Sequence, residues 1–218
     1  MGEKMQVKKE DVKEKIINSA CREFLDHSYA DASLRVIAEK AGLTKGAVYS
    51  YFKNKDVLFC ELTAPAVRFI ENEFQYDKSC HVSITKGNSS DLFESNIQGF
   101  RNYVHAVLDN YESFKLLLFC AAGSSLQDYK ERIIQLYARN FHARLSLSIN
   151  TENREGIIGE MFVHTLAAIY ISFLEELVLH EPNRTEADEY AVQMAIFVQS
   201  GIEKLYSYQS LRQFFTSV

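Results

Sequence analysis

Residues 33–55 constrain the fold more than any other part of the sequence, because they carry the signals for a helix, a turn and a second short helix. Ser33 precedes an apolar pattern with helical spacing, and a serine there accepts a hydrogen bond from a free amide of the first turn. Gly42 stands where the first helix must end, since glycine adopts the left-handed conformation without a steric cost. Thr44 offers a second N-cap. The pattern predicts a helix-turn-helix.

The second helix of this pair is predicted to have a basic and aromatic outer face. Val48, or Ala47, and Phe52 would point inward in a helix of about two turns. Lysines neutralise phosphates, hydroxyl groups bond phosphate oxygens or base edges, and glycine lets the backbone approach DNA. A helix-turn-helix places its second helix in the major groove, so we predict DNA binding. The alternative is a solvated helical hairpin within a larger helical protein.

Residues 34–59, LRVIAEKAGLTKGAVYSYFKNKDVLF, closely resemble the N-terminal DNA-binding domain of the TetR family of transcriptional regulators. The resemblance covers about a quarter of the chain and implies a three-helix domain whose third helix contacts the operator. It places Lys55 at the start of a fourth helix, in contact with phosphate, and Ser33 at a cap that also touches the DNA backbone. The family usually has a glycine where this chain has Ser28, so we expect Ser28 to make that turn. The predicted DNA-binding residues are Ser33, Thr44, Lys45, Gly46, Tyr49, Ser50, Tyr51 and Lys55.

Charge is distributed unevenly over the 218 residues, whose formal net charge is -5. Residues 1–55 carry 11 Lys and Arg against 8 Asp and Glu, whereas the rest of the chain carries 13 against 21. The basic end is therefore the end with the helix-turn-helix. Such a patch on an acidic body directs a polyanion to the patch alone.

The remaining sequence predicts an all-α protein, since it contains only two prolines and no long stretch with period two. We expect a DNA-binding domain over residues 1–54 and a larger helical effector-binding and dimerisation domain over residues 55–218. A first helix is predicted over residues 8–25, and Pro65 is placed to kink the fourth helix. The polar, glycine-containing segment 78–90 is predicted to be a loop, and a helix follows over residues 91–110.

The middle of the chain contains an apolar run from residue 111 that is interrupted at Gly123-Ser124-Ser125 and resumes toward residue 147. One interpretation is a kinked core helix. The other is a small-molecule pocket, because ligand sites between helices are mostly apolar with a few polar groups, and the family resemblance favours it. The candidate effector residues are Phe114, Leu117, Phe119 and Cys120.

Two long apolar helices are predicted near the C-terminus, over residues 159–180 and 186–206. The first is apolar nearly all round, so both of its sides must be covered. We expect these helices to pair with their symmetry mates in a homodimer, as the resemblance also implies. The alternative is a monomer that buries them internally. The predicted interface residues are Phe162, Leu166, Tyr170, Phe173, Met194, Val198, Gly201, Ile202 and Leu205.

Other classes of protein find little support. The sequence has no catalytic constellation and no nucleotide-binding glycine loop, and the pairs Glu160/His164 and Glu176/His180 lack a third metal ligand at suitable spacing. We therefore expect no enzyme activity, cofactor or metal. The start of the chain is not leader-like, the apolar run 161–174 is too short to span a bilayer, and the four cysteines are scattered. These features indicate a cytoplasmic protein with reduced thiols and no membrane partner.

Together these patterns predict a ligand-responsive transcriptional regulator. We expect a repressor that binds a near-palindromic DNA operator as a homodimer and is released by a small apolar or amphipathic effector. The competing hypothesis is a helical small-molecule-binding or carrier protein in which the helix-turn-helix is only structural. Strongly salt-dependent DNA binding would separate the two, because phosphate neutralisation imposes that dependence.

Overall fold

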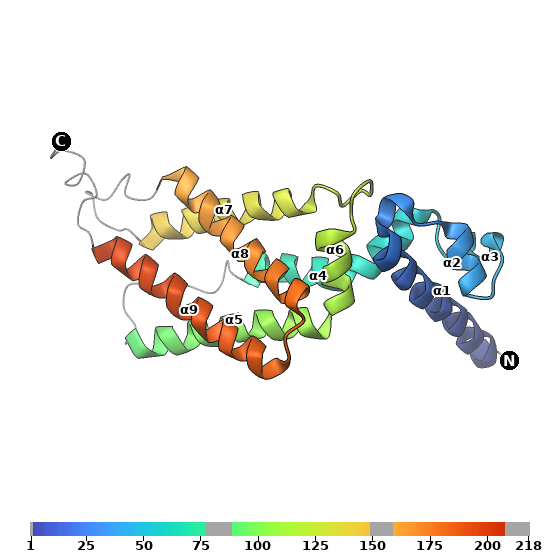
Figure 1. Ribbon diagram of the computed structural model, residues 1–218, viewed down its shortest axis with the longest axis horizontal. Helices are drawn as coiled ribbons and strands as arrows, with labels where there is room; N and C mark the ends of the chain where they lie inside the picture. The colour runs from blue at the N-terminus through green and yellow to red at the C-terminus, as the bar shows by residue number, and fades with distance from the viewer. Residues whose placement is uncertain (1, 77–88, 149–158, 208–218) are drawn as a thin grey trace. The chain divides into compact units, whose positions relative to one another are not determined.

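The computed structural model describes residues 2–76, 89–148 and 159–207, and over these ranges every regular element is an α-helix (Figure 1). The all-α prediction is confirmed, while the predicted loop at 78–90 lies almost wholly outside the described residues. The helices are α1 (Gly2–Asp31), α2 (Leu34–Lys40), α3 (Lys45–Tyr49), α4 (Lys55–Tyr76), α5 (Ser89–Asp109), α6 (Tyr111–Phe119), α7 (Tyr129–Ser148), α8 (Glu160–His180) and α9 (Arg184–Ser207).

The helices form two compact units. The first contains residues 1–71 and 110–130, and the second contains residues 72–109 and 131–218. The first unit therefore joins the helix-turn-helix to most of α4, to α6 and to the segment that follows α6. The predicted division at residues 54/55 does not coincide with this grouping, and it stays a proposal about which part of the chain binds DNA.

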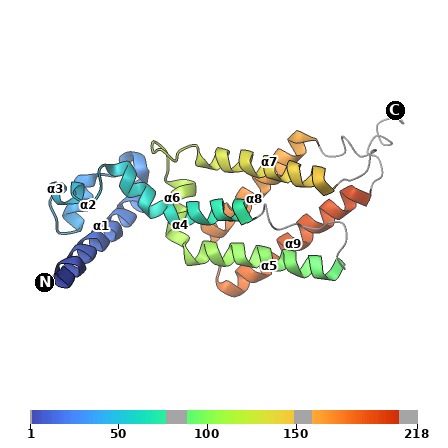
Figure 2. The ribbon, with the colours of Figure 1, turned by 180° about the vertical axis from the view of Figure 1, so that it is seen from behind.

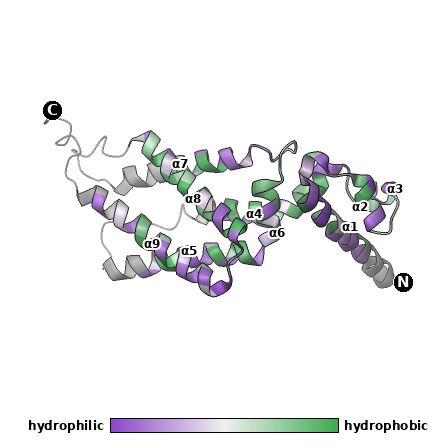
Figure 3. Cartoon of the chain, in the orientation of Figure 1, coloured by the Kyte–Doolittle hydropathy of each residue, from purple (hydrophilic) through white to green (hydrophobic). Residues whose placement is uncertain are grey.

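The core of the first unit is formed by side chains from α1, α2, α3, α4 and α6. Phe24 and Phe59 are fully buried, with ring centroids 5.1 Å apart in an edge-to-face arrangement. Tyr29 completes the cluster at 5.2 Å from Phe59. The visible face of α1 is largely hydrophilic (Figure 3), so α1 is amphipathic and buries one side only.

The first helix is longer than predicted and contains a break. It runs from Gly2 to Asp31 rather than over residues 8–25, and Ser28 has φ 58° and ψ 171° inside it. The expectation that Ser28 makes the turn is confirmed. The residues after Ser28 form a short turn that leads into α2, and we call residues 28–33 the α1–α2 junction.

Pro65 lies inside α4, where its missing N–H and its ring disturb the helical hydrogen bonds. The amide of the next residue, Ala66, donates to the buried Ser113 hydroxyl of α6 at 3.0 Å. Thr63 bonds back to the Phe59 carbonyl at 3.0 Å. The Ser113 hydroxyl thus accepts the backbone amide that follows the proline, and this contact ties α4 to α6.

The helix formed by the apolar run in the middle of the chain ends before the glycine at which the sequence predicts a break. α6 stops at Phe119, four residues before Gly123, and α7 starts only at Tyr129. The intervening residues are held within the first unit, where the Cys120 carbonyl accepts the Tyr29 amide at 2.8 Å and Asp56 accepts the Ser125 amide at 2.8 Å. Neither a continuous nor a merely kinked helix is formed.

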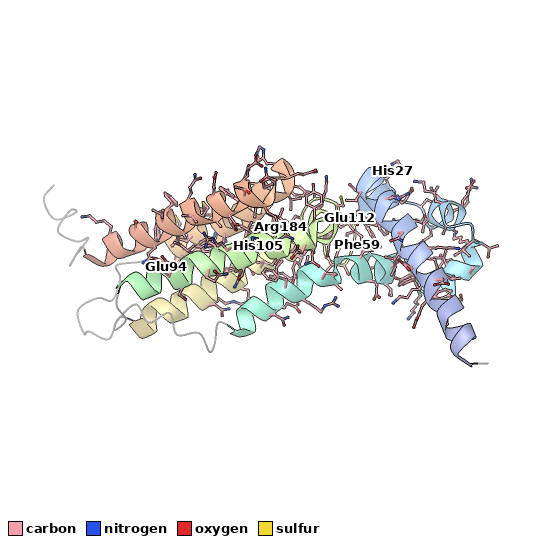
Figure 4. All side chains as sticks on the ribbon, turned by 90° about the horizontal axis from the view of Figure 1, so that it is seen from below. His27, Phe59, Glu94, His105, Glu112 and Arg184 are labelled. Atoms are coloured by element: carbon pink, nitrogen blue, oxygen red, sulfur yellow. The ribbon has the colours of Figure 1, made fainter. Side chains whose placement is uncertain are left out.

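The second unit is built around α5, which packs along α9 and also contacts α8 (Figures 1 and 2). Tyr170 of α8 stacks between Phe100 of α5 and Tyr137 of α7, with both centroid distances 5.6 Å. His105 and Asp188 link α5 to α9 at 2.9 Å. His105 on α5 and Arg184 at the start of α9 are labelled in Figure 4.

α8 is buried along only part of its surface. Its inward residues include Val163, Ile171 and Leu177, each at most 1% exposed, whereas Met161 is 86% exposed. Among the described helices, α8 is the one long and apolar enough to cross a bilayer by length and composition, a property it shares with core helices of water-soluble proteins. The predicted apolar run of 14 residues is thus part of a longer helix.

Candidate nucleic-acid interface

Both predicted N-caps of the helix-turn-helix are formed. The Ser33 hydroxyl accepts the Arg35 amide at 3.3 Å, and the Thr44 hydroxyl accepts the Ala47 amide at 3.2 Å. Gly42 has φ +70°, the left-handed conformation expected of a helix-ending glycine. These local interactions fix where α2 ends and where α3 begins.

The second helix of the motif is shorter than the two turns predicted. α3 contains five residues, and the Ser50 amide bonds both the Gly46 and Ala47 carbonyls at 3.2 Å as the helix ends. Val48 and Phe52 are buried, as expected, and Leu43 is half-buried against the same core. α3 is thus held to its unit by two inward side chains and by its turns.

The opposite face of α3 is exposed. Lys45, Gly46 and Ser50 are exposed, Tyr49 is 46% exposed, and Tyr51 is half-buried. The Lys45 ammonium lies 5.7 Å from the centre of the Tyr49 ring, a cation–π arrangement that holds the charge beside the aromatic face. The structure therefore brings these predicted residues together on one small surface.

The structure adds detail for Ser50 and Gly46. The Ser50 hydroxyl donates to the Ala47 carbonyl at 2.6 Å, so its oxygen is left mainly as an acceptor. A Cβ on Gly46 would meet only the Thr44 hydroxyl, at 3.9 Å, which is an ordinary contact. The fold itself therefore does not require glycine at position 46, and the space kept open there faces away from the protein.

Lys55 is placed differently from the other predicted DNA-binding residues. Its ammonium donates to the backbone carbonyls of Tyr29 at 2.6 Å, Ala32 at 3.1 Å and Ala30 at 3.3 Å. It also lies 4.4 Å from the centre of the Tyr29 ring. All of these partners belong to the protein, at the α1–α2 junction.

Glu23 is a residue that the sequence analysis did not identify. Its side chain is nearly fully buried and accepts the Ser33 amide at 3.2 Å and the Lys40 ammonium at 2.8 Å. Burial acts to raise the pKa of the Glu23 carboxyl, but the Lys40 and Ser33 hydrogen bonds outweigh it, so the pKa lies below its ordinary value. Helical spacing could have predicted that Glu23 is buried, because it falls on the same side of α1 as the buried Ile16 and Ala20.

Replacing Glu23 by glutamine should reduce the dependence of the unfolding free energy on pH in the acid range. A carboxyl whose pKa is lowered on folding stabilises the protein above the unfolded value, near 4.5, and loses that contribution as pH falls through the folded pKa. Thermal unfolding from pH 7 to pH 3 should therefore show a stability gap between wild type and Glu23→Gln that narrows in acid. Glu39→Gln, at an exposed position of α2, is the matched control and should show no such gap. A gap that stays constant with pH would contradict this assignment.

Cys21 and Cys120 of this unit are buried, whereas Cys60 is half-buried. Burial, with a hydrogen bond to Glu112, raises the pKa of the Cys21 thiol to about 12, and burial also raises the pKa of Cys120. Cys21, Cys60 and Cys120 form no disulfide. Protonated thiols are poor nucleophiles near neutral pH, so Cys21 and Cys120 behave as core residues. Cys80 lies outside the described residues.

The four candidate effector residues are not all on one surface. Phe114, Leu117 and Cys120 are buried in the first unit, and Phe114 packs against Phe69 with centroids 6.0 Å apart. Phe119 is 39% exposed. The effector site stays a prediction.

The predicted dimer residues are distributed between the interior and the surface. Phe173 is 2% exposed and packs against Phe100 and Tyr190 within its own unit. Phe162 and Gly201 are exposed. Four others are half-buried, namely Leu166, Tyr170, Met194 and Val198. Ile202 and Leu205 are positions of α9 whose side chains lie outside the described set. Exposed apolar residues that the sequence analysis missed are Met161, Leu179, Ile196 and Phe197.

Comparison with known proteins supports the interpretation of the N-terminal unit. Residues 16–62 match the model of the bacterial regulatory proteins of the tetR family. The HTH-type transcriptional regulator SrpR of Pseudomonas putida is 34% identical over 77 residues, which are 35% of this chain and 36% of SrpR. The HTH-type transcriptional regulator AcrR of Shigella flexneri is 36% identical over 62 residues, 28% of this chain and 29% of AcrR. The matched stretch thus spans about a third of the length of these curated relatives.

A likeness over most of the chain is found in the fold. The crystal structure of NalD, the secondary repressor of the MexAB-OprM multidrug efflux pump in Pseudomonas aeruginosa, superposes with a TM-score of 0.55 at 18% sequence identity. The superposition covers 87% of this chain and 95% of NalD. The two curated relatives are both named as transcriptional regulators. The helix-turn-helix segment of this chain thus matches the tetR family of bacterial regulatory proteins in sequence, and the chain as a whole is similar in fold to NalD.

Proposed function

We propose that this protein is a cytoplasmic transcriptional repressor that binds a near-palindromic DNA operator as a homodimer and is released by a small apolar or amphipathic effector. The observation that carries the DNA-binding part is the exposed face of α3. There Lys45, Tyr49 and Gly46 present a cation, an aromatic ring and an open backbone on a helix that is capped and packed from behind. Such a face fits the major groove, where residues near the start of the second helix contact base edges.

The homodimer part is supported by apolar surface on α8 and α9. Phe197 is 65% exposed, Leu179 59% and Ile196 45%. Ile196 and Phe197 are adjacent on α9, and contiguous exposed apolar surface marks interaction sites in soluble proteins. A second copy of the chain is the occupant we propose, because two α3 helices held at a fixed spacing contact a palindrome that one α3 could not bind specifically.

The effector part is supported by the way α4 connects to the helix-turn-helix. α4 starts at Lys55 on the α1–α2 junction and is bonded to α6 through Ala66 and Ser113. A ligand that favours a shifted α4 would alter the position of the junction and so of α2 and α3. Release from DNA then requires different ligand affinities for the two arrangements. Repression is the mode described for NalD, and we extend it to this chain as part of the proposal.

The DNA-binding proposal predicts that Lys45→Gln and Tyr49→Ala weaken binding without changing the fold. Duplexes selected from random-sequence DNA by the wild-type protein supply the probe, and affinity is measured by fluorescence anisotropy at several salt concentrations. We expect each variant to lose about 1–3 kcal/mol of binding free energy, because each removes a contact to phosphate or base. Circular dichroism and light scattering should match the wild type.

Lys130→Gln is the control for charge, since Lys130 is exposed at the start of α7 and not on α3. It should leave DNA binding unchanged. Wild-type affinity in both α3 variants would refute the assignment of these residues. A wild-type protein that shows no salt-dependent binding to any selected duplex would refute the function and favour a helical carrier protein.

A further inference from the structure

Lys55 occupies an unusual electrostatic position at the first residue of α4. A cation at the start of a helix opposes the helix dipole, whose positive end is there. The three hydrogen bonds from its ammonium offset this cost, because they end on the Tyr29, Ala30 and Ala32 carbonyls. Carbonyls at the end of a helix lack intrahelical donors and attract cations. The Lys55 side chain thus joins the start of one helix to the end of another.

The number of acceptors is significant, because an ammonium group has three donors. Three carbonyl oxygens within 3.3 Å match that number, and the Tyr29 ring lies 4.4 Å from the same nitrogen. A phosphate could be bound only if one of these interactions were given up. The ammonium is therefore already committed within the protein.

The carbonyls that Lys55 holds belong to the segment that positions α2. Ala32 is buried, and the next residue, Ser33, caps α2 through its hydroxyl and bonds Glu23 through its amide. α2 in turn packs against α3. The Lys55 side chain consequently acts on the orientation of the recognition helix through the junction, at a distance from the exposed face of α3.

We propose that Lys55 is a positioning residue for DNA binding, which holds the α1–α2 junction against α4, and not a phosphate ligand. The proposal rests on the proposed DNA-binding function. It differs from what the family resemblance implies for this position. It also means that Lys55 adds a charged contact to the apolar contacts, such as Phe59 with Tyr29, that join α4 to the α1–α2 junction.

The salt dependence of DNA binding distinguishes the two roles. Each phosphate contact that is lost lowers the slope of log K against log salt by about 0.9 per protomer. Lys55→Gln, measured on duplexes selected by the wild-type protein, should bind about tenfold more weakly at every salt concentration, the size of one lost charged hydrogen bond. Its slope should equal that of wild type. Lys45→Gln, on the exposed face, is the comparison and should lower the slope.

Lys55→Arg gives a second readout that does not depend on the first. Arginine suits a phosphate at least as well as lysine, but its planar fork cannot direct three donors from one nitrogen to the three carbonyls. The proposal therefore expects Lys55→Arg to bind more weakly than wild type with an unchanged slope. Full affinity in Lys55→Arg, together with a reduced slope in Lys55→Gln, would show a phosphate contact and overturn the proposal.

The remaining outcomes also decide the matter. Unchanged affinity in Lys55→Gln would contradict a positioning role, and if that variant fails to fold, the Lys55→Arg measurement alone decides between the two roles. A reduced slope in Lys55→Gln with normal wild-type binding would refute only this proposal. Absence of salt-dependent binding by the wild type would instead refute the proposed function, and the positioning role with it.

Discussion

Phe59→Ala is expected to lower the free energy of unfolding by about 3–5 kcal/mol, the cost of removing a large buried aromatic side chain and leaving a cavity. Phe59 is fully buried at the start of α4, and its ring contacts both Phe24 and Tyr29 edge-on. Tyr29 belongs to the α1–α2 junction, so the cavity would open directly beneath the residues that position α2. Urea unfolding followed by circular dichroism, at one fixed protein concentration, measures the loss.

The sequence offers a matched control for this change. Phe119→Ala removes the same side chain from the end of α6, where Phe119 is 39% exposed. Only part of the Phe119 side chain is removed from water on folding, and its truncation leaves no enclosed cavity, so the loss should be clearly smaller than that of Phe59→Ala. Equal losses in the two variants would show that the cluster around Phe59 does not form the core of its unit.

Features that depend on a few neighbouring residues were predictable from the sequence. Ser33 and Thr44 form the caps, and Ser28 makes the turn with a positive φ, because capping and turn formation are decided by residue type at a fixed offset. The exposed face of α3 follows from the same local spacing. This part of the candidate site could therefore be predicted from the sequence alone.

Features that depend on contacts between distant residues were not predictable. The C-cap residue of α6, Cys120, accepts through its carbonyl the amide of Tyr29, which lies far away in the sequence. Lys55 has its partners 23 to 26 residues away, so its sequence position alone could not show that its ammonium is bonded within the protein. The phosphate contact that the family resemblance implies for Lys55 stays a prediction, beside the positioning role proposed above.

α9 shows why periodicity can fail for an interface. Apolar residues occur on more than one of its sides, and the sequence does not say which side meets α5. The structure buries Ala191 and Ala195 and exposes Ile196 and Phe197. Phe173 of α8 illustrates the reverse case, since a predicted interface residue is buried within its own unit. The small side chains of α9 are thus buried and the larger ones are exposed, where the proposed dimer would cover them.

Phe197→Glu is expected to convert the proposed dimer into a monomer. Phe197 is the most exposed aromatic residue among those described, and the exposed Ile196 is adjacent to it. In a two-fold symmetric dimer each substitution occurs twice, so two aromatic anchors of about 2 kcal/mol each would be lost, and two carboxylates would be placed in apolar surroundings. A loss of about 4 kcal/mol is a roughly thousandfold increase in the dissociation constant.

Light scattering at micromolar concentration measures this change. Wild type should have about twice the chain mass of 25.0 kDa, and Phe197→Glu should approach 25.0 kDa with unchanged helical content. Gln98→Glu adds the same charge at an exposed site on α5 and should remain dimeric, which separates loss of apolar contact from added charge. Because specific DNA binding needs two α3 helices at a fixed spacing, the Phe197→Glu monomer should also lose most of its affinity for the selected duplex while keeping an intact α3. A monomeric wild type would refute the proposed dimer, and a Phe197→Glu variant that stays dimeric would show that Phe197 is not in the interface.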